Sequence, residues 1–379
     1  MYTLSLVQTR YLRLRAQRLI PAGTKTSDSV AQLVRDVCGL QAQEPPAAVL
    51  AVWVRRGGLV ASQVEDARLH ERSILRTWCM RGTLHLLATE DFGWLVPLLG
   101  PVFVRKSQRR YAELGLTEEI CAKATRTIRG TLGDQGPLTR AELAEQLAEQ
   151  GLPTEGQAAY HLMRRAALEG AICYGPERAG EPTYILIEDW VHTGRWGGGG
   201  AGNDARAELV RRYLAAYGPA GPKDLGAWSG LSVSEARASF ELVSDELLEV
   251  EVDGSPSWIL KSRAAWLDEP REAGVVVRLL PSYDPYLLGY RGRDLTVPQR
   301  YAKRVHPGGG VLRPTLIVDG CAAGTWKLKR GGAGLVVTVE PFEDLGVQVT
   351  AALEDEVQDL GRFYELDATL SVVTPAMQK

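Results

Sequence analysis

The sequence predicts an α+β protein in which groups of helices are each followed by a two-stranded hairpin. Three observations support this fold class. Apolar residues recur at helical spacing through residues 1–270. Short runs rich in β-branched residues, separated by turn residues, follow each group of helices. One segment recurs at an offset of 82 residues, which indicates repeated units. Helices followed by a hairpin are the plan of a winged helix.

The first unit is predicted to span residues 1–115. Apolar periodicity predicts four helices, over residues 3–20, 30–37, 47–54 and 62–69. The period then changes to that of a hairpin, with strands over residues 75–79 and 82–87 and a glycine at the turn. We therefore expect a first winged helix in this part of the chain.

A second unit, residues 116–196, and a third, residues 203–270, repeat this plan. Residues 136–144 resemble residues 218–226, and each segment lies between two predicted helices. The second helices cover residues 157–168 and 232–243. Each unit ends in a strand pair, 171–174 with 184–187 and 248–252 with 258–261. The glycine-rich residues 197–202 are predicted to form a linker between the two units.

The last predicted domain, residues 275–379, is rich in β structure. Strands are expected over residues 275–280, 315–318, 335–339 and 346–351, with a closing helix over residues 353–364. This pattern predicts a β-barrel-like domain, either a small barrel or a curled sheet. Residues 281–330 also hold nine Lys and Arg residues against three Asp, although the whole chain has a net charge of −2. A basic surface on an otherwise neutral protein is typical of phosphate binding.

Composition excludes several classes of protein. The five cysteines are scattered without a Cys-x-x-Cys spacing, so we expect free thiols, no metal and no cofactor. No apolar run approaches the length of a membrane span, and the first twenty residues lack the apolar block of a signal peptide. We therefore expect a cytoplasmic protein without membrane contact.

Two amide side chains, Gln41 and Gln43, stand just before Pro45 and Pro46. Proline disfavours the α region in the preceding residue, so this stretch is predicted to be extended, with both amides on one face. Amides offer donors and acceptors but no proton that titrates near neutral pH. Such a pair can orient a water molecule. The alternative interpretation is that the glutamines only cap the preceding helix.

The hairpin adds further candidate residues. Strand alternation places Thr83 and His85 on one face, whereas Arg76 and Trp78 alternate on the partner strand. Trp78 is a candidate for stacking on an exposed base, with burial in the core as the alternative. A buried structural histidine is likewise the alternative for His85.

Four motifs resemble those of the AlkZ-type DNA glycosylases, and together they cover nearly the whole chain in order. They are Gln41-x-Gln43, the Arg-Thr-(x)3-Arg-Gly-Thr-Leu-His run from Arg76 to His85, the Pro-x-Tyr-Asp-x-Tyr-Leu-Leu-Gly-Tyr-Arg segment from Pro281 to Arg291, and His306-Pro307 with the later Val318-Asp319-Gly320 and Gly324-Thr325-Trp326. The resemblance implies a bacterial enzyme that hydrolyses the N-glycosidic bond of alkylated purines, especially N7-substituted guanine. Its partner would be double-stranded DNA carrying alkylated guanine, and we expect a monomer associated with the nucleoid.

Some relatives in that family carry aspartate at the position of Gln43, so this chain resembles the double-glutamine branch. Members of that branch act on bulky natural-product adducts or interstrand crosslinks, where base excision repair gives antibiotic self-resistance. The family's Gln-x-Gln and Thr-Leu-His positions fall here on Gln41, Gln43, Thr83 and His85.

The chemistry fits these residues. Alkylation at N7 makes guanine cationic, so the base leaves without added protonation. The enzyme then has to stabilise a sugar with oxocarbenium character and to place a water molecule. We assign Gln41 and Gln43 to this catalysis, and Thr83 and His85 to the lesion's phosphate or sugar. No lysine is placed to form a Schiff base, which predicts a monofunctional glycosylase. Glu44 is the competing base, and its side chain is expected to face away.

Lys327, Lys329 and Arg330 form a predicted basic hairpin tip that could enter a DNA groove. We expect an open DNA-binding cleft between the winged helices and the barrel-like domain. The alternative function is a transcription regulator whose tandem winged helices bind an operator. Its base-reading helix would be residues 157–168, which offer Gln157, His161, Arg164 and Arg165.

Overall fold

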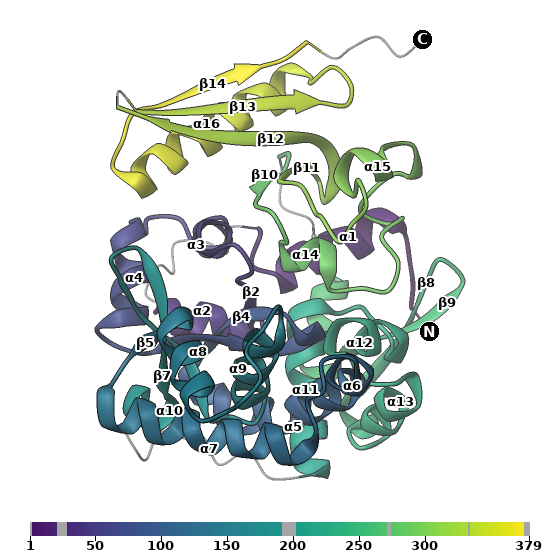
Figure 1. Ribbon diagram of the computed structural model, residues 1–379. Helices are drawn as coiled ribbons and strands as arrows, with labels where there is room; N and C mark the ends of the chain where they lie inside the picture. The colour runs from purple at the N-terminus through teal and green to yellow at the C-terminus, as the bar shows by residue number, and fades with distance from the viewer. Residues whose placement is uncertain (1, 21–28, 192–201, 271–273, 333, 375–379) are drawn as a thin grey trace.

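The computed structural model describes residues 2–20, 29–191, 202–270, 274–332 and 334–374 (Figure 1). Its first part contains the predicted helices and hairpin. The helices are α1 (Leu6–Ala16), α2 (Val30–Asp36), α3 (Pro45–Trp53) and α4 (Ala61–Leu69), and the strands are β2 (Leu40–Gln41), β3 (Ile74–Trp78) and β4 (Leu84–Ala88). Two further helices follow, α5 (Thr89–Lys106) and α6 (Gln108–Glu113). Among the described helices, none is both long and apolar enough to cross a membrane.

The second part of the chain is joined to the first through a shared sheet. Its elements are α7 (Glu118–Gln135), β5 (Leu138–Thr139), α8 (Arg140–Glu149), α9 (Ala158–Leu168), β6 (Ile172–Arg178), β7 (Glu181–Leu186) and α10 (Ile187–Trp190). The strand order is β2-β4-β3-β6-β7-β5. The connection between the two parts is the pairing of β3 with β6, where Arg76 lies opposite Tyr174. One six-stranded sheet therefore replaces two independent hairpins.

The third part holds a second, smaller sheet. Its elements are α11 (Asn203–Tyr217), α12 (Pro222–Ser229), α13 (Val233–Glu241), β8 (Leu247–Val252) and β9 (Ser255–Leu260). The N-terminal strand β1 (Tyr2–Leu4), which periodicity did not predict, pairs in parallel with β8. Residues 192–201 lie outside the described residues, and so does nearly all of the predicted glycine-rich linker.

The C-terminal part is an open sheet within the described residues, so the small barrel that was one of the two predicted forms is not found. Strands β10 (Val277–Leu280), β11 (Thr315–Val318), β12 (Cys321–Gly331), β13 (Gly334–Pro341) and β14 (Ala368–Val372) follow one another in order, and within the described residues the first and last strands do not pair. The short helices α14 (Pro285–Leu288) and α15 (Ala302–Val305) lie between strands. Short 3₁₀ helices cover Met80–Gly82, Ser244–Glu246, Lys261–Leu267 and Gln299–Tyr301.

Residues 346–351 were predicted as a strand, but they form the start of helix α16 (Val347–Tyr364), with Gly346 as its N-cap. Buried Leu353, Val357 and Leu360 lie on one face of this helix. Their spacing follows the helical period, which continues through the residues that looked like a strand. Figure 1 shows α16 along the C-terminal sheet, on the side that faces α3.

The buried cores cross the predicted domain boundaries. One hydrophobic cluster contains residues from Cys38 to Tyr290, and another contains residues from Leu14 to Ala368. The division into four domains therefore stays a prediction from the sequence repeats, because the apolar faces of these parts pack against one another.

A buried ion pair joins the first and last parts of the chain. Arg55 donates through both terminal nitrogens to the Asp284 carboxylate, at 2.7 Å each, and both side chains are fully buried. The indole of Trp53 adds a second link by donating to the Asp359 carboxylate at 2.9 Å. These contacts fix the C-terminal sheet against α3.

We predict that Asp284→Ala destabilises the protein by about 3–5 kcal/mol, because it leaves the Arg55 charge buried without its partner. The measurement is the free energy of unfolding in urea. The matched control is Glu188→Gln in the exposed pair Arg129–Glu188, which should cost less than about 1 kcal/mol. Equal losses in the two variants would contradict the importance of the buried pair.

Candidate active site

Gln41 ends the short strand β2 at the edge of the six-stranded sheet, and Gln43 lies two residues beyond the strand. Cys38 and Gly39 have φ of 55° and 92°, and this left-handed pair turns the chain from α2 into β2. Strand β2 then pairs antiparallel with β4, with Gln41 opposite His85. The pairing continues where the Ala42 amide donates to the Leu84 carbonyl at 2.7 Å. This pairing places Gln41 and Ala42 beside the first residues of β4, and Gln43 follows directly in the chain.

The two amides have different surroundings. Gln41 is 7% exposed, and its Oε1 accepts from Arg81 at 2.7 Å. Gln43 is exposed, and its Oε1 accepts a longer bond of 3.4 Å from the Leu84 amide. Glu44 is also exposed and extended, with φ −110° and ψ 109°, while Pro45 and Pro46 begin α3. Neither glutamine caps α2, which ends at Asp36.

Arg81 contacts both Gln41 and His85, and no role was predicted for it from the sequence. It lies in the turn between β3 and β4 with a left-handed φ of 55°. Its Nη2 donates to Gln41 Oε1 and also lies 3.2 Å from His85 Nε2. Its Nη1 donates to the carbonyl of Trp228 in α12 at 3.2 Å. The signals in the sequence were its place in the turn before Gly82 and in the family-like run from Arg76 to His85.

His85 is a buried, neutral histidine. It is 1% exposed, and its Nδ1 lies 3.0 Å from the Thr83 carbonyl. A carbonyl only accepts and a guanidinium only donates, so Nδ1 carries the proton and Nε2 accepts from Arg81. Burial, and then the charge of Arg81, lower the pKa of His85 well below its usual value of 6.5. Both ring nitrogens have partners within the protein, which favours the alternative of a buried structural histidine, while the contact with the lesion's phosphate or sugar stays a prediction.

Two other predicted contact residues hold the local backbone. Thr83 is partly exposed, and its hydroxyl donates to the Met80 carbonyl at 3.2 Å. Arg76 donates through Nε to the carbonyl of Ala42, between the two glutamines, at 3.0 Å. Its guanidinium also lies over the Tyr174 ring, 4.5 Å from the centroid. Arg76 therefore stabilises the backbone between the two glutamines.

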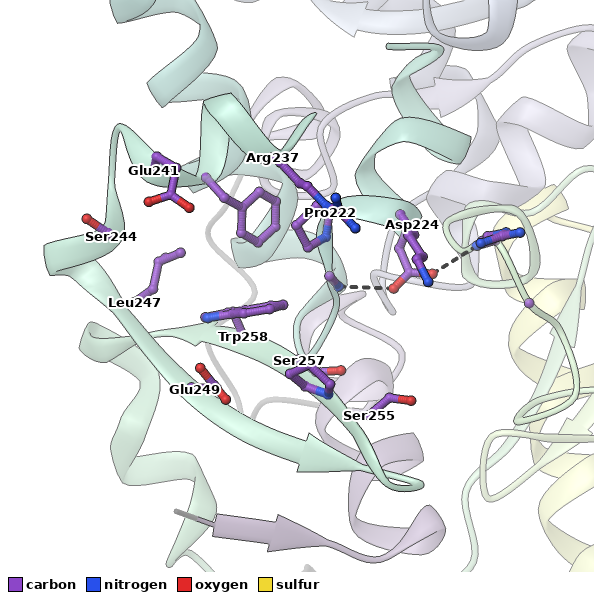
Figure 2. Close-up of a pocket in the computed structure, with 16 residues that line it drawn as sticks. Pro222, Asp224, Arg237, Glu241, Ser244, Leu247, Glu249, Ser255, Ser257 and Trp258 are labelled. Atoms are coloured by element: carbon purple, nitrogen blue, oxygen red, sulfur yellow. Dashed lines mark hydrogen bonds between the residues drawn. The ribbon is translucent and has the colours of Figure 1, made fainter. Parts of the chain in front are cut away.

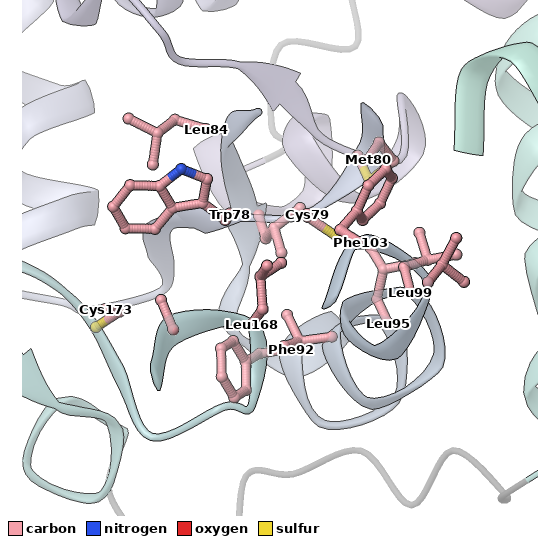
Figure 3. Close-up of a cluster of buried hydrophobic side chains, with 14 of the residues drawn as sticks. Trp78, Cys79, Met80, Leu84, Phe92, Leu95, Leu99, Phe103, Leu168 and Cys173 are labelled. Carbon is pink, nitrogen blue, oxygen red and sulfur yellow. The ribbon is translucent and has the colours of Figure 1, made fainter. Parts of the chain in front are cut away.

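Trp78 belongs to the core, so the prediction that it stacks on a base was wrong. It is 1% exposed and packs against Tyr174 and Tyr184, with ring centroids 5.3 Å and 6.4 Å away. Figure 3 shows it in the apolar cluster that contains Leu84 and Phe92. Its position on a strand buried on both faces explains the error, because alternation alone does not distinguish a buried face from an exposed one.

The predicted basic hairpin is present between β12 and β13. Lys327, Lys329 and Arg330 are all exposed. Lys327 forms an ion pair with Glu340 at 2.8 Å, and Arg330 lies 5.8 Å from the Tyr364 ring centroid. Among the described residues, no carboxylate pairs with Lys329 or Arg330. These two residues therefore carry the charge that is available to a phosphate.

A separate pocket lies away from the two glutamines. It has a volume of roughly 740 Å³ and is lined by α12, α13 and the β8–β9 hairpin, with Phe240 and Trp258 as its aromatic walls (Figure 2). Its lining contains neither glutamine and no residue of the β3–β4 turn. The candidate active site is thus an edge of the sheet rather than this pocket.

The helix that a regulator would use for base readout is occupied by contacts within the protein. Arg164 donates to Ser107 and to the Gly82 carbonyl, and Arg165 is 6% exposed and pairs with Glu118. Gln157 accepts from Arg110 at 2.8 Å. These contacts do not favour the regulator.

Comparison with known proteins decides the family. Residues 34–363 match the family described as DNA glycosylase AlkZ-like. The chain belongs to the AlkZ-like DNA glycosylase family. It is 29% identical over 364 residues to the interstrand DNA cross-link repair glycosylase of Streptomyces sahachiroi, covering 92% of this chain and 94% of that protein.

The solved structure of Streptomyces sahachiroi DNA glycosylase AlkZ superposes with a TM-score of 0.83 at 27% identity, over 98% of this chain and all of that one. The predicted resemblance to the family is therefore confirmed. As an AlkZ-like DNA glycosylase, this protein is an enzyme that binds DNA and hydrolyses N-glycosyl bonds.

We predict that the imidazole of His85 stays neutral, with the proton on Nδ1, at pH values well below 6.5, because burial and the charge of Arg81 lower its pKa. Nitrogen-15 NMR of the histidine rings reports both the tautomer and the titration. Because the folded-state pKa is depressed, the associated stability is present above pH 6.5 and is lost as the pH falls. An ionisation of His85 above pH 6.5 would contradict the assignment.

Proposed function

We propose that this enzyme removes N7-alkylated guanine from duplex DNA, with Gln41 and Gln43 positioning the attacking water. Bulky adducts and interstrand crosslinks are included, since a relative is named for interstrand cross-link repair. The observation that carries the proposal is the pair of amides beside a neutral imidazole. Within the described part of the chain, no carboxylate forms a hydrogen bond with Gln41, Gln43 or His85.

A site of this composition suits a leaving group that is already charged. Glycosidases that act on neutral leaving groups use one carboxylic acid to protonate the leaving atom. N7-alkylguanine is cationic, so the electron pair of the breaking C1′–N9 bond neutralises the base without a proton donor. The water oxygen bonds to C1′, and its surplus proton passes to solvent. Neutral dipoles are sufficient for these steps when they are held in place.

The remaining features support the same proposal. Exposed Lys329 and Arg330 suit a DNA groove or backbone. Among the described residues, no lysine forms a hydrogen bond with either glutamine, which supports hydrolysis without a Schiff base and without strand cleavage. We further propose that the enzyme works as a monomer in the cytoplasm, at the nucleoid, and gives self-resistance to an alkylating natural product.

The deciding experiment incubates the protein with duplex DNA carrying N7-methylguanine or a bulky N7-guanine adduct. We expect free modified base in solution and an abasic site that breaks only after alkali. Unmodified duplex is the control. Absence of free base from simple and bulky lesions alike would refute the proposed substrate, and breakage without alkali would refute monofunctional hydrolysis.

We predict that Gln41→Ala and Gln43→Ala each lower the single-turnover rate by about 100-fold, since each removes a preorganised dipole. DNA affinity should stay within about threefold in both variants, because the amides act on the transition state. Glu44→Gln is the matched control next to the pair, and it should keep nearly the full rate. A loss confined to affinity, or a loss in Glu44→Gln equal to those of the alanine variants, would mean that the roles are wrongly assigned.

We predict that Lys329→Ala and Arg330→Ala each weaken DNA binding and reduce the slope of log affinity against log salt by about 1, because each removes one phosphate contact. The single-turnover rate at saturating enzyme should change little. Fluorescence anisotropy at several salt concentrations measures the DNA affinity and its dependence on salt. Arg129→Ala, on α7 and paired with Glu188, is the charge-matched control and should leave the slope unchanged.

A further inference from the structure

We infer that Arg81 is a positioning residue that fixes the amide of Gln41 and thereby gives the two glutamines different tasks. Gln41 offers its Nε2 hydrogens to the oxygen of the attacking water, whereas Gln43 offers its carbonyl oxygen to a hydrogen of the same water. This inference rests on the proposed function and adds a division of labour to it.

The orientation of Gln41 follows from the chemistry of its partner. A guanidinium has five N–H donors and no acceptor, so the amide atom 2.7 Å from Arg81 Nη2 has to be the oxygen. The second hydrogen of Nη2 serves His85 Nε2 at 3.2 Å. Within the described residues, Nε2 of Gln41 has no hydrogen-bond partner and is not among the fully buried, unsatisfied atoms. Its donors therefore remain available.

The turn that carries Arg81 is contacted by residues of three helices, α12, α9 and α5. Nη1 of Arg81 donates to the Trp228 carbonyl in α12. The next residue, Gly82, has φ +67°, and its carbonyl accepts from Arg164 of α9 at 3.2 Å. A Cβ on Gly82 would lie 2.5 Å from Arg164 Nη2 and 2.9 Å from the Phe103 ring. The turn is therefore closely packed, and the guanidinium has one defined position.

The charge of Arg81 decides which atom of Gln41 can act. Because the guanidinium is charged, its bond to the amide oxygen is charge-assisted. Among the described residues, no carboxylate pairs with this guanidinium and offsets its charge. A positive charge beside that oxygen opposes its use against a cationic sugar. Gln43 is exposed, and its oxygen receives only the 3.4 Å bond from a neutral backbone amide. The oxygen of Gln43 is thus the better acceptor for water and the better dipole for the sugar.

The test is a double-mutant cycle on the single-turnover rate, with DNA affinity measured separately. Arg81→Met should lower the rate by at least about tenfold while affinity stays within about threefold, and Arg81→Lys should recover part of the rate. Adding Arg81→Met to Gln41→Ala should cost less than about threefold more, because the interaction is already lost. Adding it to Gln43→Ala should multiply the two losses.

Lys106→Met is the matched control. It removes a side-chain bond of 2.6 Å to the Gly230 carbonyl, just beyond the end of α12, and does not touch Gln41. We expect its rate within about threefold of the parent. A loss as large as that of Arg81→Met would assign the effect to the folding of this region, and multiplicative losses in the Arg81–Gln41 pair would overturn the inference.

A second readout does not depend on activity. The side-chain amide signals of Gln41 in nitrogen-15 NMR should shift in Arg81→Met and stay in place in Lys106→Met. Unchanged signals in Arg81→Met would overturn the positioning role even if the enzyme is active. Failure of the parent protein to release any base would instead refute the proposed function, while the NMR result would still report on Arg81.

Discussion

The antiparallel pairing of β2 with β4 is the constraint on which the site depends. Strand β2 has two residues, and it enters the sheet through a left-handed pair at Cys38 and Gly39. Its register sets Gln41 opposite His85, within reach of the turn that holds Arg81. A shift by one residue would turn the side chain of Gln41 to the other face of the sheet. The edge position leaves Gln43 exposed, while the neighbouring strand buries His85.

The charged and neutral groups around the two glutamines limit the reactions that this site can catalyse. Burial and then the charge of Arg81 lower the pKa of His85, and Arg81 also donates to the Gln41 oxygen, so the nearby groups are a cation, a neutral imidazole and two amides. Such a set does not supply a proton to a leaving group, which is consistent with a base that already carries a positive charge. Elsewhere a buried cation is matched by a buried anion, as in the pair of Arg55 with Asp284.

Residues from several parts of the chain contact the turn that carries Arg81. The six-stranded sheet joins the first two parts through β3 and β6, and the turn before β4 is contacted by Arg164 from α9 and by the Trp228 carbonyl from α12. The hydrophobic clusters also run across the sequence repeats. The position of Arg81 is therefore a property of the whole helical part, which explains why a residue in a short turn can have a fixed orientation.

The sequence by itself determined most helices, the hairpins and the family, because periodicity and short motifs are local properties of the chain. It did not determine that Trp78 is buried, that the C-terminal sheet is open, or that β1 pairs with β8. Only the tertiary structure decided the partners of His85 and the contacts of Arg81. The physical reason is that these depend on contacts between residues far apart in sequence, such as Arg81 with Gln41 and Trp228, and side-chain alternation carries no information about such distances.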